Sequence, residues 1–365
     1  MRVLVTVNDA VGHLFPLVPT LTALTEAGAD VLVACPGSAV EAVADRFAVR
    51  AVEPSEVEVP AFPAAADREE RFLFAVTRRW PNNARAWVSG LLNEVEIWEP
   101  ELVIVEPTEH AGRVVAAVLG VPWVEHGWGF TLPATTDGEA TASIGDLYSS
   151  FKTSPRPTVM QVDLGPQRLQ APDAGAVSRF RYRPWSPPAV GGTLSAPIRR
   201  RRILVSLGTS PNPDAAARLA TAARAAASTG AETIVVLGNR DISDQSWPDD
   251  AVVVPWIDTA REVARCELVI HHGGAGTAYA SLLAGVPAVC LPQMGDQFRN
   301  ANLLAAAGVC LVSKPEDANE THLVALLEQA LTDNRLATQT KALRDQNALM
   351  PDVDDLADAL LEQAA

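Results

Sequence analysis

The sequence has no long uninterrupted run of apolar residues. No stretch approaches the roughly 20 apolar residues that a helix needs to cross a bilayer, so we expect no transmembrane segment. The first apolar run, Val3–Val7, turns polar at Asn8 and Asp9, and it therefore predicts a strand rather than the core of a signal peptide. These absences favour a cytoplasmic protein.

Basic residues are scarce as well. The chain has 29 Lys and Arg against 44 Asp and Glu, which gives a formal net charge of −15. Binding of DNA or RNA needs a concentrated basic face, so the composition disfavours a nucleic-acid partner. The basic cluster Arg199–Arg202 stands before an apolar strand and is typical of a solvated linker edge.

Cysteines and metal-binding patterns are few. Cys35, Cys266, Cys290 and Cys310 lie far apart, without Cys-x-x-Cys spacing, in or beside apolar strands. This pattern favours buried, reduced thiols over a disulfide or a zinc site. The Asp-x-Asp pattern occurs only at residues 352–354, in a terminal helix-like stretch away from any strand end. No metal ligands are therefore predicted.

What the sequence does have is length and a regular alternation of elements. Its 365 residues, 48% hydrophobic and 20% charged, suit two domains of roughly 150–200 residues each. Strand-like runs alternate with amphipathic stretches in both halves, which indicates parallel strands joined by helical crossovers. The alternating segments are Val3–Val7, Leu14–Ala27, Val31–Ala34, Leu102–Val105, Gly112–Leu119 and Pro122–Val124, then Ile203–Ser206, Asp214–Ser228, Thr233–Leu237, Leu268–His271, Thr277–Ala284, Ala288–Leu291 and Asn300–Ala307.

The alternation stops between about Arg181 and Arg200, in a segment rich in proline and glycine. We interpret this segment as an interdomain linker. The predicted organisation is an N-terminal domain over 1–185, a linker over 186–200, a C-terminal domain over 201–350 and a C-terminal helix over 351–365. Whether that helix packs back on the N-terminal domain is left open.

The most informative segment is 268–277, Leu-Val-Ile-His-His-Gly-Gly-Ala-Gly-Thr. It predicts a strand that runs through glycines into a helix beginning near Ala275. Unpaired N–H groups at a helix start, with glycines that allow close approach, suit a diphosphate. His272 and Thr277 can add hydrogen bonds. Tyr279 occupies the third glycine position of the dinucleotide fingerprint and no P-loop motif occurs, which disfavours redox cofactors and ATP.

Three further segments follow strands at the same end of this predicted sheet. Residues 206–210 form a small-hydroxyl turn that, alone, favours ordinary capping. Asp296 and Gln297 lie in a loop where they could hydrogen-bond sugar hydroxyls, although Asp296 also suits a helix N-cap. Trp256 and Ile257 could place apolar surface and backbone polar groups beside a nucleobase.

Together these segments resemble the donor-binding half of family-1 GT-B glycosyltransferases, particularly bacterial enzymes that glycosylate antibiotics. The run 271–277 and the Asp-Gln-x-x-Asn-Ala element at 296–301 carry most of the resemblance, which extends over nearly the whole chain. It implies an α/β fold of the GT-B type, with two Rossmann-like doubly wound domains facing a central cleft. The donor-binding residues that it implies are Gly208, Thr209, Ser210, Trp256, Ile257, His272, Gly274, Ala275, Gly276, Thr277, Asp296 and Gln297.

In the first half, Gly-His-Leu-Phe-Pro at residues 12–16 follows the first strand. A lone histidine at a helix start is more often a capping or surface residue. The motif, however, resembles the N-terminal signature of the same family, where this histidine, here His13, is the general base. An imidazole suits the task because its usual pKa is about 6.5. Glu106 takes the position at which the family usually has an Asp paired with the histidine. Glu109 is the alternative partner, and either carboxylate could simply be solvated.

Aromatic residues gather in two regions of the first half. They suit a bulky, flat, partly apolar ligand, and core packing explains them equally well. The resemblance implies that these regions line an acceptor pocket, with Trp80, His126 and Trp128 as contacts and an aromatic polyketide, macrolide or similar aglycone as acceptor. The two groups are Phe62, Phe72, Phe74, Trp80 and Trp87, and Trp123, His126, Trp128 and Phe130.

The resemblance thus predicts an inverting, metal-independent glycosyltransferase of the hexosyltransferase type. It would move a (deoxy)sugar from a TDP- or UDP-sugar to a small natural-product aglycone, without a further cofactor. Two alternatives stay open: a non-catalytic nucleotide-sugar-binding helper, and a nucleotide-sugar epimerase on the GT-B fold. Neither accounts for His13 together with Glu106. The acceptor, the sugar, the type of glycosidic bond and a homodimeric state are also left open.

Overall fold

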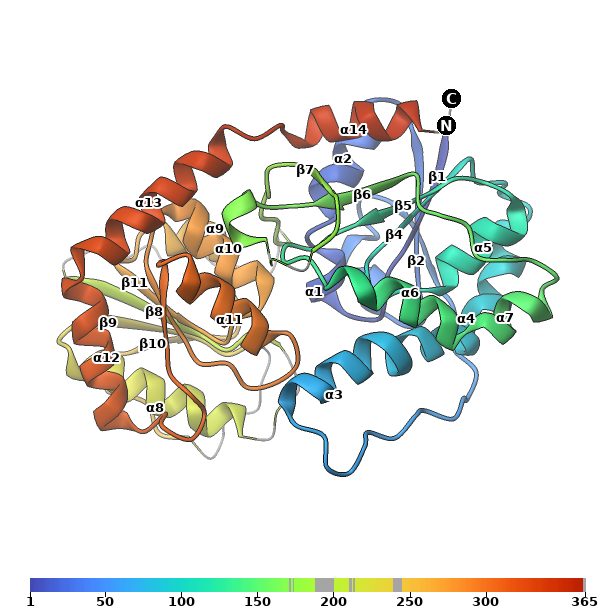
Figure 1. Ribbon diagram of the computed structural model, residues 1–365. Coiled ribbons are helices and arrows are strands. Elements are labelled where there is room, and N and C mark those ends of the chain that lie inside the picture. Colours follow the sequence, from blue (N-terminus) through green and yellow to red (C-terminus); the bar gives the residue numbers. More distant parts are fainter. Residues whose placement is uncertain are drawn as a thin grey trace. The chain divides into compact units, whose positions relative to one another are not determined.

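The computed structural model describes residues 1–170, 172, 174–187, 200–209, 212, 214–238 and 245–363. Ser210 and residues 188–199 of the predicted linker lie outside the described residues. The chain divides into two compact units, Met1–Trp185 together with Met350–Ala365 (unit 1) and Ser186–Leu349 (unit 2). Each is described by itself below, with element labels as in Figure 1.

The described residues of unit 1 form a seven-stranded parallel sheet in the order β3-β2-β1-β4-β5-β6-β7. The central strands are almost wholly apolar, as expected for parallel strands that are covered on both faces. The strands are β1 Arg2–Thr6, β2 Asp30–Cys35, β3 Ala48–Ala51, β4 Leu102–Val105, β5 Trp123–His126, β6 Met160–Asp163 and β7 Ser178–Arg179.

Helices cover both faces of this sheet (Figure 1). On one face, Leu4 and Val103 pack with Trp87 of α4 and Val114 of α5 in a buried apolar cluster. On the other lies α2, against which α14 packs. A π-helical turn, η2, joins α3 to α4. The helices are α1 Val11–Leu14, α2 Val18–Glu26, η1 Ala39–Val43, α3 Arg68–Phe74, η2 Ala75–Arg79, α4 Trp80–Val95, α5 Ala111–Leu119, α6 Ala134–Ser143, α7 Gly145–Ser150, η3 Gln167–Leu169 and α14 Val353–Glu362.

Helix α14 belongs to unit 1 although the chain first passes through unit 2. Its N-cap is Asp352, whose side chain forms a capping box with that of Asp355. The Asp352 carboxylate also pairs with Arg181 and with Arg183, the latter at 2.9 Å. The Asp-x-Asp pattern of the sequence is therefore a helix start whose first carboxylate is held by two arginines.

Unit 2 repeats the architecture with a six-stranded parallel sheet among its described residues, in the order β10-β9-β8-β11-β12-β13. Successive residues of β8 enter different apolar clusters: Ile203 packs with Leu219 of α8, and Leu204 packs with Val263 of α9. Both faces are therefore covered. The elements are β8 Arg202–Ser206, α8 Ala215–Ser228, β9 Glu232–Val236, β10 Val252–Val254, α9 Thr259–Val263, β11 Leu268–His271, α10 Ala275–Ala284, β12 Ala288–Cys290, α11 Gln297–Ala306, β13 Cys310–Val312, α12 Glu320–Thr332 and α13 Asn334–Ala348.

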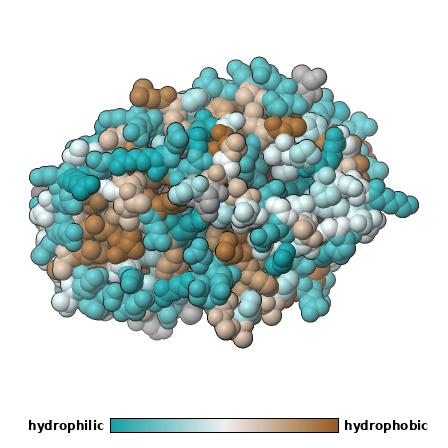
Figure 2. All heavy atoms as spheres, viewed as in Figure 1, coloured by the Kyte–Doolittle hydropathy of each residue, from teal (hydrophilic) through white to brown (hydrophobic). Residues whose placement is uncertain are grey.

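The apolar residues lie mostly inside these layers. The face shown in Figure 2 is largely hydrophilic, with smaller apolar areas between the polar side chains. All four cysteines are buried and free of disulfides. Among the described residues, no helix has both the length and the apolar composition that spanning a membrane requires.

Candidate functional site

In unit 1 the strand order changes direction at β1. The chain leaves β1 toward β2 on one side and later returns to β4 on the other. Loops at the carboxyl ends of such a strand pair diverge and leave room for side chains and ligands. His13, in α1, follows β1 after a short loop, and Glu106 follows β4 directly. The topology thus brings together two residues that are 93 positions apart.

The two side chains lie within hydrogen-bonding distance of each other. His13 Nδ1 lies 2.9 Å from Glu106 Oε1. Glu106 is completely buried, whereas the His13 side chain keeps 26% of its surface exposed. The indole of Trp128 stacks on the imidazole, with ring centroids 4.4 Å apart and planes inclined by 30°. Glu106 therefore holds one edge of the imidazole, and Trp128 packs on one of its faces.

Hydrogen bonds from two neighbouring residues fix the Glu106 carboxylate. Asn8 Nδ2 donates to Oε1 at 2.8 Å, and the backbone N–H of Thr108 donates to Oε2 at 2.7 Å. The Thr108 hydroxyl lies 3.0 Å from both oxygens. Burial raises the pKa of Glu106, but the charge and hydrogen bond of His13, together with the bonds from Thr108, bring it below its usual range. The carboxylate is thus ionised and accepts from His13 Nδ1, so Nε2 carries the lone pair whenever the imidazole is neutral.

Glu109 has different partners. Its carboxylate accepts hydrogen bonds from the backbone N–H groups of Ala111 and Gly112, at the start of α5, and from the Thr6 hydroxyl at 2.6 Å. A Cβ on Gly112 would lie 2.1 Å from Thr6 Oγ1, so only glycine allows this approach. Burial raises the pKa of Glu109 to about 7. Of the two glutamates considered from the sequence, it is Glu106 that lies against His13.

The aromatic residues predicted to contact an acceptor have diverse surroundings. Trp128 packs on His13, and half-buried Trp80 lies edge-on to Phe72 with centroids 6.4 Å apart. His126 is fully buried: Nε2 lies 2.9 Å from Thr20 Oγ1 and Nδ1 lies 2.8 Å from the Gly127 carbonyl. Burial lowers its pKa to about 4. His126 is a satisfied core histidine, which does not fit the acceptor contact expected for it.

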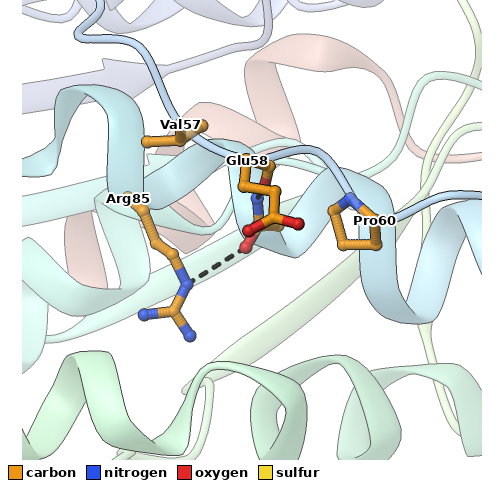
Figure 3. Close-up of a pocket in the computed structure, with 5 residues that line it drawn as sticks. Val57, Glu58, Pro60 and Arg85 are labelled. Atoms are coloured by element: carbon orange, nitrogen blue, oxygen red, sulfur yellow. Dashed lines mark hydrogen bonds between the residues drawn. The ribbon is translucent and has the colours of Figure 1, made fainter.

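An open groove lies between the loop that precedes α3 and helix α4 (Figure 3). It has a volume of about 450 Å³ and is lined by Val57, Glu58 and Pro60 of the loop and by Asn82 and Arg85 of α4. Arg85 Nε donates to Asn82 Oδ1 at 3.1 Å, and Asn82 Nδ2 donates to the Glu58 carbonyl at 2.8 Å. These bonds hold the loop on the helix, within the region expected to line the acceptor pocket.

Unit 2 has its own change of direction, between β8 and β11. Ser206 ends β8, and Gly208 follows with φ +63°. His271 ends β11, and the chain passes through His272 and two glycines into α10, whose N-cap is Gly274. The N–H groups of the first turn of a ten-residue helix therefore stand beside the turn that follows β8.

The glycines of this site are required by the position of His272. A Cβ on Gly208 would lie 2.4 Å from His272 Cε1, and a Cβ on Gly274 would lie 2.4 Å from His272 Nε2. Gly273 has φ +93°, and a Cβ there would lie 2.8 Å from the Gln297 carbonyl oxygen. The imidazole is held between two stretches of bare backbone, and any side chain at either glycine would displace it.

Helix α11 is tied to the same turn by a residue that the sequence indicated only as part of a motif. Asn300 Nδ2 donates to the Gly273 carbonyl at 2.9 Å and to Asp296 Oδ2 at 2.8 Å. Gln297 Oε1 accepts from the backbone N–H groups of Gln293 and Met294. The Asp-Gln-x-x-Asn pattern thus builds the loop in which Asp296 and Gln297 lie, and Asn300 joins it to the glycine turn.

The remaining predicted donor-site residues are placed as follows. Ala275 begins α10, and Gly276 and Thr277 lie in its first turn, where Gly276 is exposed and Thr277 half-buried. Thr209 is exposed and Trp256 half-buried. Ile257 is 1% exposed and packs in the apolar core, so its side chain is not available to a base.

His271, Cys290 and Cys310 are the described residues whose arrangement could hold a metal, with ligand atoms within 4.8 Å of one another. The N–H of Gly273, however, donates to His271 Nδ1 at 3.0 Å. Nε2 must then carry the ring proton and offers no lone pair to a metal. Burial lowers the pKa of His271 to about 3 and raises that of Cys290. The cluster is best described as a neutral part of the core beneath the glycine turn.

The sequence matches two family models, described as the N-terminal domain (residues 64–208) and the C-terminal domain (residues 220–363) of erythromycin biosynthesis protein CIII-like proteins. Elloramycin glycosyltransferase ElmGT of Streptomyces olivaceus is 32% identical over 348 residues, which cover 90% of each chain. The L-demethylnoviosyl transferase of Streptomyces niveus is 31% identical over 372 residues, or 96% of this chain and 95% of that protein.

Solved structures of similar proteins confirm the fold. Spinosyn rhamnosyltransferase SpnG has a TM-score of 0.86 at 24% identity, covering 99% of this chain and 100% of its own, and has also been solved with thymidine diphosphate. The glycosyltransferase SnogD from Streptomyces nogalater has a TM-score of 0.81 at 25% identity, covering 100% of this chain and 99% of its own. The predicted fold class, GT-B with two parallel α/β units, is correct.

Proposed function

This chain belongs to the erythromycin biosynthesis protein CIII-like family of glycosyltransferases, and we propose that it transfers a deoxysugar to a natural-product aglycone. The donor is a sugar linked to thymidine or uridine diphosphate, and the reaction inverts the anomeric centre. Two proteins that resemble it over most of their length support this proposal: one is named an elloramycin glycosyltransferase and the other an L-demethylnoviosyl transferase.

The observation that carries this proposal is the contact of His13 Nδ1 with the buried Glu106 carboxylate at 2.9 Å. With Nδ1 donating to Glu106, Nε2 is the basic nitrogen. It removes the proton of the acceptor hydroxyl as that oxygen bonds to the anomeric carbon. The bond from this carbon to the diphosphate breaks, and the nucleoside diphosphate leaves with the electron pair. The proton stays on His13, where Glu106 stabilises the imidazolium.

A glutamate in place of the more usual aspartate does not weaken this assignment. The longer side chain is held at both oxygens, by Asn8 at Oε1 and by Thr108 at Oε2. Because the carboxylate is completely buried, its attraction to the imidazolium is little screened by solvent.

On the donor side, the first turn of α10 offers N–H groups and the positive end of the helix dipole to the diphosphate. His272 lies at the same turn and adds a hydrogen bond or a charge. These groups are in place before the reaction, so they stabilise the charge that develops on the leaving diphosphate without reorganising. Asp296 and Gln297 contact the sugar hydroxyls from the start of α11.

The test is an assay of the purified protein with a panel of thymidine- and uridine-diphosphate sugars and of hydroxylated polycyclic and macrolide aglycones. Mass spectrometry detects the glycosylated product, and the coupling constant of its anomeric proton, measured by NMR, reports whether the configuration is inverted. We expect a glycosylated aglycone of inverted configuration. A protein that binds thymidine diphosphate but glycosylates no acceptor, or one that epimerises the donor, would instead support the helper or the epimerase.

A further inference from the structure

A Gly-Trp-Gly sequence at residues 127–129 follows β5, and the backbone requires both of its glycines. The N–H of Gly127 donates to the Val162 carbonyl of β6 at 2.9 Å, and a Cβ on Gly127 would lie 2.8 Å from that oxygen. Gly129 has φ +143°, a conformation that residues with a side chain rarely adopt. The two glycines thus fix the course of the chain on either side of Trp128, which is 6% exposed.

His126, the last residue of β5, ties this segment to the part of the chain that carries His13. Its pKa is lowered by burial to about 4, so the ring is neutral. Nδ1 lies 2.8 Å from the Gly127 carbonyl oxygen, which can only accept, and Nδ1 therefore carries the ring proton. Nε2 then accepts from the Thr20 hydroxyl at 2.9 Å. Because Thr20 lies in α2, which follows α1 in the chain, His126 joins the segment of Trp128 to that of His13.

The indole of Trp128 packs on the imidazole of His13, with ring centroids 4.4 Å apart. A cation within roughly 6 Å of the centroid of an aromatic ring is attracted to the negative face of that ring, and tryptophan attracts it most strongly. Glu106 faces the same imidazole with a negative charge from the loop after β4. Both neighbours therefore favour the protonated imidazole, which is the form that a general base reaches when it takes up a proton.

We propose that Trp128 is a positioning residue for the general base: it holds the imidazole of His13 against Glu106 and stabilises the imidazolium that forms when the acceptor hydroxyl loses its proton. The inference rests on the proposed function. It gives Trp128 a role through His13, in place of the direct contact with the acceptor that the family resemblance implies. Trp128 is 6% exposed, whereas the His13 side chain is 26% exposed, so an acceptor reaches the imidazole more readily than the indole.

The first experiment needs neither donor nor acceptor. The pKa of His13 is measured by NMR titration of carbon-13-labelled histidine rings, and His13→Ala identifies its signal among the six histidines. Trp128→Leu keeps an apolar side chain beside the imidazole but removes the aromatic face, and we expect it to lower the pKa of His13 by about 0.4 to 0.7 unit. If Trp128 only shielded the imidazole from water, its loss would raise this pKa instead. A rise, or no change, would therefore overturn the proposal.

Two further variants guard this test. Trp128→Phe keeps an aromatic face of weaker attraction, so the pKa of His13 should lie between its values in the wild type and in Trp128→Leu. The matched control is Trp98→Leu, the same exchange on the apolar cluster of unit 1, at the opposite end of β4 from Glu106; it should leave this pKa unchanged. If Trp128→Leu does not fold, Trp128→Phe still decides the matter, because a pKa at or above that of the wild type would overturn the proposal.

The second experiment links the contact to the reaction, with an acceptor that the wild type glycosylates. Trp128→Leu should lower kcat about 2- to 5-fold and leave KM for the acceptor unchanged, and Trp128→Phe should restore part of the loss. A raised KM at unchanged kcat would show that Trp128 contacts the acceptor, which would overturn this inference and leave the proposed function standing. The expected fall in the pKa of His13, found in a protein that glycosylates no acceptor, would instead support the stabilisation of the imidazolium and overturn the proposed function.

Discussion

In both units, the loop after the first strand meets the loop after the strand at the change of direction, β4 in unit 1 and β11 in unit 2. The residues at the two places differ in kind. Unit 1 has a titratable pair, His13 and Glu106, held by side-chain hydrogen bonds. Unit 2 has glycines packed around His272 and the start of a ten-residue helix.

The difference shows that one topology can serve two kinds of chemistry. Moving a proton needs a group of suitable pKa and a buried partner that fixes its tautomer. Binding a diphosphate needs several N–H groups that a large anion can approach closely, which is a property of bare backbone. The parallel sheet supplies the place in both units, and the short loops supply the chemistry.

The largest effect is expected for a variant that removes the proton-transfer role of unit 1 and leaves the donor-binding role of unit 2 intact. In His13→Ala, we expect kcat to fall by about 10²- to 10⁴-fold, the usual contribution of a general base. The affinity for thymidine diphosphate should not change, because the groups proposed to bind it lie in unit 2. Steady-state kinetics and calorimetry measure the two quantities. A parallel loss of nucleotide affinity would contradict the division of roles.

A second prediction sharpens the contrast between the two buried carboxyls of unit 1. Burial raises the pKa of Glu109 from 4.5 to about 7. The folded chain therefore holds this proton more tightly than the unfolded chain, and the stability that results is present below pH 4.5 and is lost as the pH rises through 7. Glu109→Gln cannot ionise, so its free energy of unfolding relative to that of the wild type should rise between pH 5 and pH 8, by up to roughly 3 kcal/mol.

Urea unfolding at the two pH values measures this effect, and Glu106→Gln is its matched control. The pKa of Glu106 is lowered in the fold, so its ionised form is the stabilising one, and that stability is lost as the pH falls through the lowered pKa. Glu106→Gln should therefore lose stability at pH 8, where Glu109→Gln gains it. The same sign for both variants would refute the assignment.

A third prediction concerns the glycines of unit 2. Gly208→Ala places a methyl group 2.4 Å from the present position of His272 Cε1. We expect the displaced imidazole to weaken thymidine diphosphate binding about 10-fold, a loss of about 1.4 kcal/mol. Gly230→Ala is the matched control, since Gly230 has a similar positive φ of +76° but no atom within 4 Å of the added Cβ. Equal effects of the two variants on affinity would point to backbone strain instead.

The smallest effect tests whether the two units are stabilised separately. Asp352 caps α14 in unit 1, and Asp333 caps α13 in unit 2. Replacing either by Ala should cost about 1 kcal/mol. Hydrogen exchange should then speed up in β1 for Asp352→Ala and in β8 for Asp333→Ala. Faster exchange in both strands from either variant would show that the units unfold together.

The sequence allowed most of the fold to be predicted because the signals are local. Apolar strands, amphipathic helices and the glycine turn at 273–276 each reflect the conformational preferences of a few neighbouring residues. The predicted strand at Leu268–His271 and the helix beginning near Ala275 have those bounds in the structure. Positions that depend on a partner from another element were harder to predict.

His126 is the clearest example of that difficulty. The family resemblance implies that His126 contacts the acceptor. In the structure, Thr20 of α2, which is 106 positions away, satisfies one of its nitrogens in the core. Likewise, the side chain of Ile257 completes an apolar cluster, which leaves only its backbone groups for the predicted contact with a base. In both cases the side chain's surroundings come from distant segments, which periodicity does not report.

By itself, the sequence determined the two α/β halves, the glycine turn and the candidate pair of residues that follow β1 and β4, since these depend on local backbone preference and on recognisable motifs. Only the tertiary structure decided that Glu106 lies against His13 while Glu109 holds the start of α5. Only it decided that Trp128 stacks on His13. The physical reason is that hydrogen-bond partners, burial and the pKa shifts that follow from burial depend on which distant residues fold around a side chain.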